Sequence, residues 1–225
     1  MANLDLIITD GKIELVGLLS VPDGCLGLVL FAHGSGSSRY SPRNVSVARI
    51  LNQAGIGTLL FDLLTPEEAE LTGTGRSKVF NIPFLASRLQ MATHWVNSKE
   101  QLKKLNIAYL GASTGAAAAL LAAANLGDQI VAVISRGGRP DLAMSCLDRV
   151  SAEVVLIVGS EDDWVLEQNR LALQRLRRAH LEVILGATHL FEEPGALERV
   201  SQLTRDHLHE IFRKSKGVWS GGKIA

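Results

Sequence analysis

The chain has little cysteine and no net charge, and each shortage excludes a class of protein. Its two cysteines, Cys25 and Cys146, are too few for a disulfide framework and form no Cys-x-x-Cys or Cys/His metal motif. Basic and acidic residues balance at 23 each. A zero net charge argues against a dedicated nucleic-acid or anionic-membrane binder, since both need a basic surface, but leaves room for a local basic patch. We therefore expect no bound metal, and neither nucleic acid nor membrane as a partner.

Long apolar runs are missing as well. None approaches the ~20 residues that span a bilayer. The N-terminal segment carries acidic side chains at Asp5, Asp10 and Glu14 and no basic region, so it does not predict a signal peptide, and we expect a cytoplasmic protein. The chain is long enough to bury one sizeable core. We expect a single domain over residues 1–214 and a flexible tail over residues 215–225.

Short apolar runs alternate with longer segments of helical periodicity. Two alternating runs flank the turn signal Asp10-Gly11 and predict an antiparallel hairpin. The alternation of strands and helices predicts an α/β fold, with a mostly parallel, twisted sheet and helices on both faces. The predicted strands span residues 4–9, 12–20, 26–32, 57–63, 107–110, 130–135, 154–158 and 181–185. The predicted helices span residues 42–54, 82–96, 115–125, 165–179 and 195–212.

The first predicted helix follows a loop rich in glycine and serine. Ser41 suits its cap, Pro42 suits its first turn, and Gly55 suits its end. We expect its buried face to consist of the apolar residues Val45, Ala48, Ile50 and Leu51.

The most informative segment is Gly111-Ala112-Ser113-Thr114-Gly115. It follows a predicted strand and precedes an alanine-rich helix, so Ser113 lies at the tight turn between them. This pattern is typical of a nucleophile elbow, in which strained backbone geometry exposes the serine Oγ. Small residues are needed on both sides because strand and helix pass so closely that a Cβ at either glycine would collide.

A serine nucleophile needs a base, and the base needs an orienting acid. Asp162 and His189 each follow a predicted strand, so both lie at the same end of the sheet as Ser113. His189 suits the general base because the pKa of imidazole lies near neutral pH. Asp162 is the expected acid; its neighbour Asp163 is the alternative and otherwise caps the next helix. The other histidines are expected to organise a loop (His33) or to lie on or beside helices (His94, His180, His207, His209).

With these residues the chain resembles the α/β-hydrolase superfamily over roughly residues 10–213. Its small size and the lack of a cap are similar to the dienelactone-hydrolase-like branch, because only about twenty residues separate Ile134 from Val154, where other members insert a cap domain. Dienelactone hydrolases proper use a cysteine nucleophile, so a serine favours an ordinary serine esterase. The segments that carry the resemblance are His33-Gly-Ser-Gly, Gly-Ala-Ser113-Thr-Gly, Gly-Ser-Glu-Asp162 and Ala-Thr-His189.

In this fold the oxyanion hole is made by backbone N–H groups, which here are those of Thr114 and, from the loop after the third strand, Ser35. Glycines at positions 34 and 36 let that backbone approach the substrate. The competing interpretation of this loop is a phosphate or dinucleotide cradle. However, Gly34-x-Gly36 is not continued to a third glycine, and no Walker lysine follows.

Two arginines, Arg136 and Arg139, begin the loop at the end of the sixth strand. An arginine there suits a bidentate grip on a substrate carboxylate. The alternative is an arginine paired with a loop acid such as Asp141 or Asp163. Residues 65–79 similarly predict either part of the rim of the site or a solvated loop with a short helix.

These residues together predict a hydrolase that cleaves a carboxylic ester, lactone or thioester through an acyl-enzyme on Ser113, without metal or organic cofactor. The expected partner is a small ester-type substrate, and we expect a monomer or a homodimer. Two alternatives stay open. One is acyl transfer or peptide cleavage by the same residues, and the other is a non-catalytic binding protein on a hydrolase scaffold.

Overall fold

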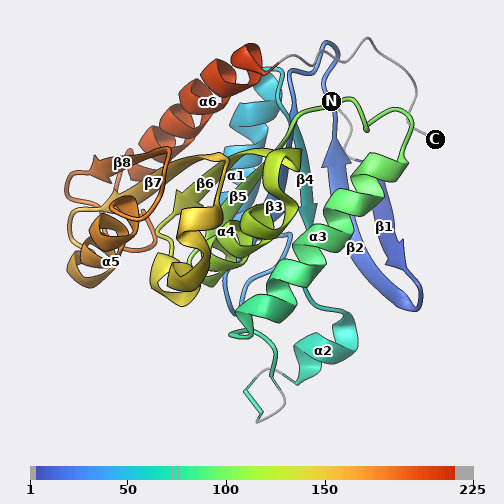
Figure 1. Cartoon of the computed structure of the whole chain (residues 1–225), viewed down its shortest axis with the longest axis horizontal. Coiled ribbons are helices and arrows are strands. Elements are labelled where there is room, and N and C mark those ends of the chain that lie inside the picture. Colours follow the sequence, from blue (N-terminus) through green and yellow to red (C-terminus); the bar gives the residue numbers. More distant parts are fainter. Residues whose placement is uncertain (1–3, 72, 75–76, 216–225) are drawn as a thin grey trace.

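In a computed structural model, which describes residues 4–71, 73–74 and 77–215, the chain forms an eight-stranded sheet between two layers of helices (Figure 1). The strand order is β1-β2-β4-β3-β5-β6-β7-β8. β2 is antiparallel to its neighbours β1 and β4, and β3 to β8 are mutually parallel. The strands are β1 (Leu4–Asp10), β2 (Ile13–Ser20), β3 (Leu28–Ala32), β4 (Gly57–Phe61), β5 (Ile107–Ala112), β6 (Ile130–Arg136), β7 (Glu153–Gly159) and β8 (Ala179–Ile184).

Helices cover both faces of this sheet, as the alternating pattern predicts. One layer consists of α1 (Pro42–Gln53) and α6 (Ala196–Lys214), and the other of α3 (Ile82–Ser98), α4 (Thr114–Leu126) and α5 (Asp163–Leu173). The short α2 (Pro66–Glu70) projects below the sheet in Figure 1. Two 3₁₀ segments complete the described part, η1 (Gly127–Gln129) and η2 (Pro140–Arg149).

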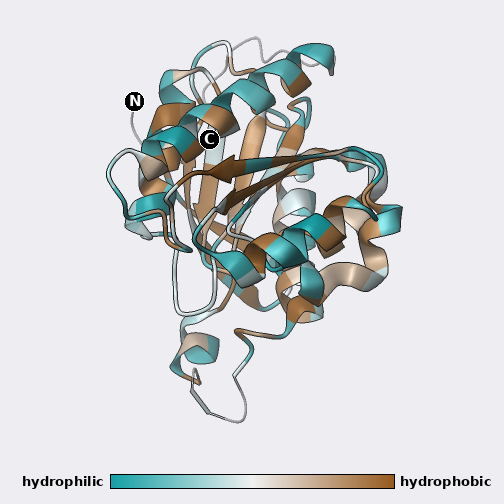
Figure 2. Ribbon diagram, turned by 90° about the vertical axis from the view of Figure 1, so that its left-hand side faces the viewer, coloured by the Kyte–Doolittle hydropathy of each residue, from teal (hydrophilic) through white to brown (hydrophobic). Residues whose placement is uncertain are grey.

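The hydrophobic core is divided in two by the sheet. Strands β3, β4 and β5 are buried over their whole length, which is why they read as continuous apolar runs. Figure 2 shows the strands mostly in brown between helices whose outer turns are teal. Cys25 and Cys146 are buried free thiols in this core. No described helix is long and apolar enough to cross a membrane.

The predicted α/β fold is confirmed, including its antiparallel hairpin and the lack of a cap. Residues 137–152, between β6 and β7, hold only η2, so within the described ranges nothing covers the carboxyl ends of the strands as a separate domain. The tail was predicted over residues 215–225. All of it except Ser215 lies outside the described residues.

The prediction was wrong at the end of α5 and the start of β8. The helix ends at Leu173 instead of residue 179, because pairing with β7 draws Ala179 and His180 into the sheet. His180 therefore lies in a strand and not on or beside a helix. Leu185, predicted to end the strand, is 87% exposed and lies beyond it.

The buried face of α1 also differs from the predicted one. Val45 is 44% exposed, whereas Asn44 is 2% exposed and points inward. The inward residues are Asn44, Val47, Ala48 and Leu51, spaced i, i+3, i+4 and i+7. Periodicity of apolar residues alone could not place Asn44, because a polar residue occupies the first inward position.

Two glycines hold β5, α4 and β3 in contact at the end of the sheet. A Cβ added at Gly111 would lie 2.4 Å from Cα of Ala116, and one at Gly115 would lie 2.2 Å from the carbonyl oxygen of Ala32. Neither neighbour is a side-chain end that could move aside, because both are backbone atoms. The predicted requirement for small residues around Ser113 is therefore confirmed.

We expect Gly111→Ala to cost about 3 kcal/mol or more, because the methyl group must displace backbone. For a chain of this length the midpoint of thermal unfolding should fall by roughly 6–12 °C. The matched control is Gly24→Asn, at a glycine with φ of 67° and open space around its Cβ position. Asparagine tolerates that backbone, so the control should cost at most about 1 kcal/mol. Equal midpoints for the two variants would contradict this account of the packing.

Candidate active site

Ser113 occupies the turn between β5 and α4 in a strained backbone conformation. Its φ is 51° and its ψ is −120°, values that non-glycine residues rarely adopt and that cost about 1–3 kcal/mol. Three hydrogen bonds hold the turn: its N–H donates to the carbonyl of Arg136 (3.2 Å), and its carbonyl accepts from the N–H groups of Ala116 and Arg139 (both 3.1 Å). The serine is thus fixed at the carboxyl end of the sheet.

Asp162, the expected acid, contacts His189, the expected base, whereas Asp163 does not. Nδ1–H of His189 donates to Oδ2 of Asp162 over 2.5 Å. Asp163 is the first residue of α5, and its side chain is exposed. The loops after β7 and β8 are joined, because the N–H of Glu161 donates to the carbonyl of Ala187 (3.0 Å). This joint brings Asp162 to His189.

The turn that carries His189 is itself held in shape. Phe191 has a φ of 57° and is 2% exposed, so burial of its ring fixes an unfavourable backbone. Glu193 accepts from the N–H and the hydroxyl of Thr188. Ser113 and His189 line one pocket, although no hydrogen bond joins their side chains in the described structure. Such bonds are often long in unliganded sites.

Of the two N–H groups expected to form the oxyanion hole, one already donates a hydrogen bond and the other does not. The N–H of Thr114 is the first of α4 and has no acceptor within the described ranges. The N–H of Ser35 donates to Oγ1 of Thr114 over 3.0 Å, so it is already engaged. Gly34 packs against the elbow, since a Cβ there would lie 3.3 Å from that of Ser113. The loop therefore contacts the elbow, with one of the two donors unengaged.

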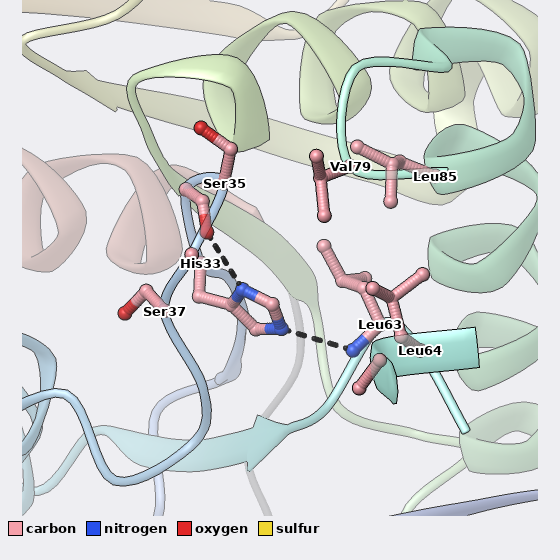
Figure 3. A pocket seen from close by; sticks show the side chains of 10 residues that line it. His33, Ser35, Ser37, Leu63, Leu64, Val79 and Leu85 are labelled. Atoms are coloured by element: carbon pink, nitrogen blue, oxygen red, sulfur yellow. Dashed lines mark hydrogen bonds between the residues drawn. The ribbon is translucent and has the colours of Figure 1, made fainter. Parts of the chain in front are cut away.

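His33 ties this loop to the segment that follows β4, as expected of a loop-organising residue (Figure 3). Its Nε2 accepts from the N–H of Leu63 (3.1 Å), so its Nδ1 carries the proton and donates to the carbonyl of Gly34 (2.9 Å). Burial lowers the pKa of His33 below its ordinary value of 6.5, against the opposing effects of Gly34 and Asp62. Only the neutral ring can make both bonds.

Two pockets flank the loop of residues 34–37. One, which we call the serine pocket, has a volume of about 260 Å³ and contains Ser113, His189 and Arg136 in its wall. The other, the leucine pocket, measures about 270 Å³ and is mainly apolar. Its walls include Leu63, Leu64, Ala69, Val79 and Leu85, several of them visible in Figure 3.

The leucine pocket was not predicted. The predicted strand 57–63 included Leu63, but β4 ends at Phe61, and Leu63 and Leu64 beyond it line the pocket. From the segment predicted as rim or loop, Ala69 and Val79 line this pocket, and the short helix α2 lies at residues 66–70. A capping box at Thr65 begins that helix, and its Glu68 pairs with Arg88 (2.7 Å).

The two loop arginines differ in their hydrogen-bond partners. Arg139 pairs with Asp141 through two hydrogen bonds of 2.8 Å and stacks over the ring of Trp164 at 4.5 Å. This is the paired alternative that the sequence left open. Arg136 lies in the wall of the serine pocket and pairs with no described residue. No group of three or more His, Cys, Asp or Glu side chains among the described residues is arranged to hold a metal ion.

Comparison with known proteins gives solved structures that match this chain over nearly their whole length. The crystal structure of a dienelactone hydrolase from Anabaena variabilis is 49% identical, covers 93% of this chain and 98% of its own, and superposes with a TM-score of 0.91. Est1E from Butyrivibrio proteoclasticus is 18% identical over 93% of this chain and 99% of its own, with a TM-score of 0.78. At that identity it supports the fold alone.

A Mycobacterium tuberculosis protein with a provisional phosphoribosyl transferase name is 51% identical over 197 residues. The match covers 87% of this chain but only 44% of that protein. This chain therefore spans less than half the length of the curated relative. No protein-family model matches the chain.

We expect His33 to make the fold less stable in acid. The unfolded chain binds a proton at His33 near pH 6.5, whereas the folded chain resists it, so the free energy of unfolding falls as the pH drops below about 6.5. Urea unfolding between pH 7.5 and pH 5 measures this loss for the wild type and for His33→Asn. The variant should lose less stability on acidification; parallel curves would show that His33 does not carry the effect.

Proposed function

Because this chain belongs to the dienelactone-hydrolase-like branch of the α/β-hydrolase superfamily, we propose that it is a serine hydrolase acting on a carboxylic ester, lactone or thioester. One observation carries the proposal. The strained elbow presents Ser113 to the same pocket as His189, and Nδ1–H of His189 donates a hydrogen bond to Asp162. Nucleophile, base and orienting acid are the parts that acyl transfer to water requires.

In the first half of the proposed reaction, Oγ of Ser113 attacks the carbonyl carbon and its proton passes to Nε2 of His189. The Asp162 carboxylate holds Nδ1–H, which fixes the tautomer and stabilises the imidazolium that forms. The tetrahedral intermediate collapses when His189 returns the proton to the leaving alcohol or thiol. An acyl-enzyme on Ser113 remains.

In the second half, His189 takes a proton from water and the hydroxide attacks the acyl carbon. The intermediate breaks down as the proton moves to Oγ of Ser113, which releases the acid. Negative charge on the carbonyl oxygen develops in both halves. The Thr114 N–H, at the positive end of α4, is the proposed first donor to this oxygen. The Ser35 N–H is the proposed second donor and has to exchange Oγ1 of Thr114 for the substrate oxygen.

The name of the M. tuberculosis relative does not favour a different reaction for this chain. It describes a protein of which more than half lies outside the match. The residues gathered around Ser113 fit nucleophilic attack on an acyl carbon, and the substrate itself is set by the pockets rather than by the fold.

We expect the purified chain to hydrolyse a short neutral ester such as 4-nitrophenyl butyrate. Ser113→Ala should lower kcat by about 10⁴-fold or more while the thermal midpoint stays within a few degrees, because only the nucleophile is lost. Release of 4-nitrophenol, followed by absorbance, measures the rate. Turnover by Ser113→Ala at the wild-type rate would overturn the proposal.

A matched pair of variants tests the acid. Asp162→Asn should lower kcat on the order of 10⁴-fold, because an amide cannot hold the correct imidazole tautomer. Asp163→Asn makes the same chemical change one residue away on an exposed side chain, and should alter kcat no more than about twofold. If Asp163→Asn were the more damaging variant, the roles of the two carboxylates would have to be exchanged.

A further inference from the structure

Arg136 is a buried cation without a partner. It ends β6, is 6% exposed, and lies in the wall of the serine pocket with Ser113 and His189. Its Nη1 is buried without a hydrogen bond, and no carboxylate in the described ranges pairs with the guanidinium. Buried arginines are normally paired, because an uncompensated buried charge is strongly destabilising.

The neighbouring arginines show what ordinary pairing looks like in this chain. Arg139 is held by Asp141, and Arg43, at the pocket rim, is held by Glu192 over 3.0 Å. Burial, with a smaller effect from Arg43, lowers the pKa of Arg136 to about 10. Arg136 therefore stays protonated at neutral pH. Its positive charge is a permanent feature of the pocket.

The rest of the serine pocket is suited to an anion. The amino end of α1 contributes Ser41, Arg43 and Asn44 to the wall, and this end of the helix carries partial positive charge. Oδ1 of the buried Asn44 has no partner, so its amide is free to turn oxygen or NH₂ toward a ligand. Across the described residues, the wall of this pocket contains two arginines and no Asp or Glu.

We propose that the serine pocket binds an anionic group of the substrate, a carboxylate or a phosphate, and that Arg136 is the residue that pairs with it. The inference rests on the proposed function, because it places that anion on the ester that Ser113 attacks. A guanidinium offers parallel N–H donors that match the oxygens of either group. The pair forms when substrate enters and compensates the buried charge.

Each of the two pockets then binds a different part of the substrate. Gly34, Ser35 and Ser37 line both, so the leucine pocket opens on the other side of the same loop. Its apolar wall fits an uncharged portion of the substrate. At about 260 Å³ the serine pocket is smaller than the ~300–1,000 Å³ typical for drug-sized ligands, so it suits a small acidic group.

The test compares 4-nitrophenyl esters whose acyl chains end in a methyl group, a carboxylate or a phosphonate. Wild type and Arg136→Gln are assayed with 4-nitrophenyl butyrate, with mono-4-nitrophenyl glutarate and with the 4-nitrophenyl ester of 4-phosphonobutyrate. In Arg136→Gln the ratio of kcat/KM for an anionic ester to that for the neutral ester should fall roughly tenfold or more, mainly through KM. The ester with the larger fall identifies carboxylate or phosphate as the preferred anion.

Arg139→Gln is the matched control, because it removes a nearby arginine that already has a partner. Its ratio should change by less than about twofold, while Arg136→Lys should recover part of the anionic preference. A ratio unchanged in Arg136→Gln would overturn the inference. If Arg136→Gln does not fold, competitive inhibition of the wild type is the test. Glutarate or inorganic phosphate should inhibit the hydrolysis of 4-nitrophenyl butyrate more strongly than glutaramide does. Equal inhibition would overturn the inference.

Failure of the proposed hydrolase function can be told apart from failure of the anion site. If the function is wrong, the wild type hydrolyses none of the three esters. Anion binding is then read from thermal unfolding, where glutarate or phosphate should raise the midpoint of the wild type and not that of Arg136→Gln. Equal shifts for both proteins overturn the anion site itself.

Discussion

The arrangement depends on one close approach, that of β5 to α4 around Ser113. At Gly111 and Gly115 a Cβ atom would collide with the backbone of the neighbouring segment. The close approach of strand and helix forces Ser113 into a positive φ that a serine otherwise avoids. Hydrogen bonds from the next strand and loop, through Arg136 and Arg139, keep the turn closed. The strain is therefore maintained by the parallel sheet as a whole, and its effect is to hold a hydroxyl at the edge of that sheet.

The same edge gathers the other groups because parallel strands end together. The loops after β7 and β8 are joined by Glu161 and Ala187, and this joint brings Asp162 to His189. The loop after β3 is fixed independently, through the neutral ring of His33. Each part of the site thus has its own anchor in the sheet, and the pockets lie where the anchored loops leave space.

Much of this could be predicted from the sequence, because the signals were local. Gly-x-Ser-x-Gly between a strand and a helix predicted the turn at Ser113, and chain order placed Asp162 and His189 at the same edge. The sequence favoured Asp162 and kept Asp163 as the alternative, and the contact between Asp162 and His189 is seen only in the structure. The inward position of Asn44 and the isolation of Arg136 depend on contacts between distant segments, which periodicity does not encode. Pairing with β7 likewise overrode the helical pattern at residue 179.

The central claim is that the fold activates Ser113, and covalent labelling tests it without any choice of substrate. The protein is treated with a fluorophosphonate and its intact mass is measured, with Ser113→Ala alongside. The account predicts a single adduct on the wild type and none on the variant. No adduct on either protein, or the same adduct on both, would contradict it, and a non-catalytic binding role on this scaffold would then be the better explanation.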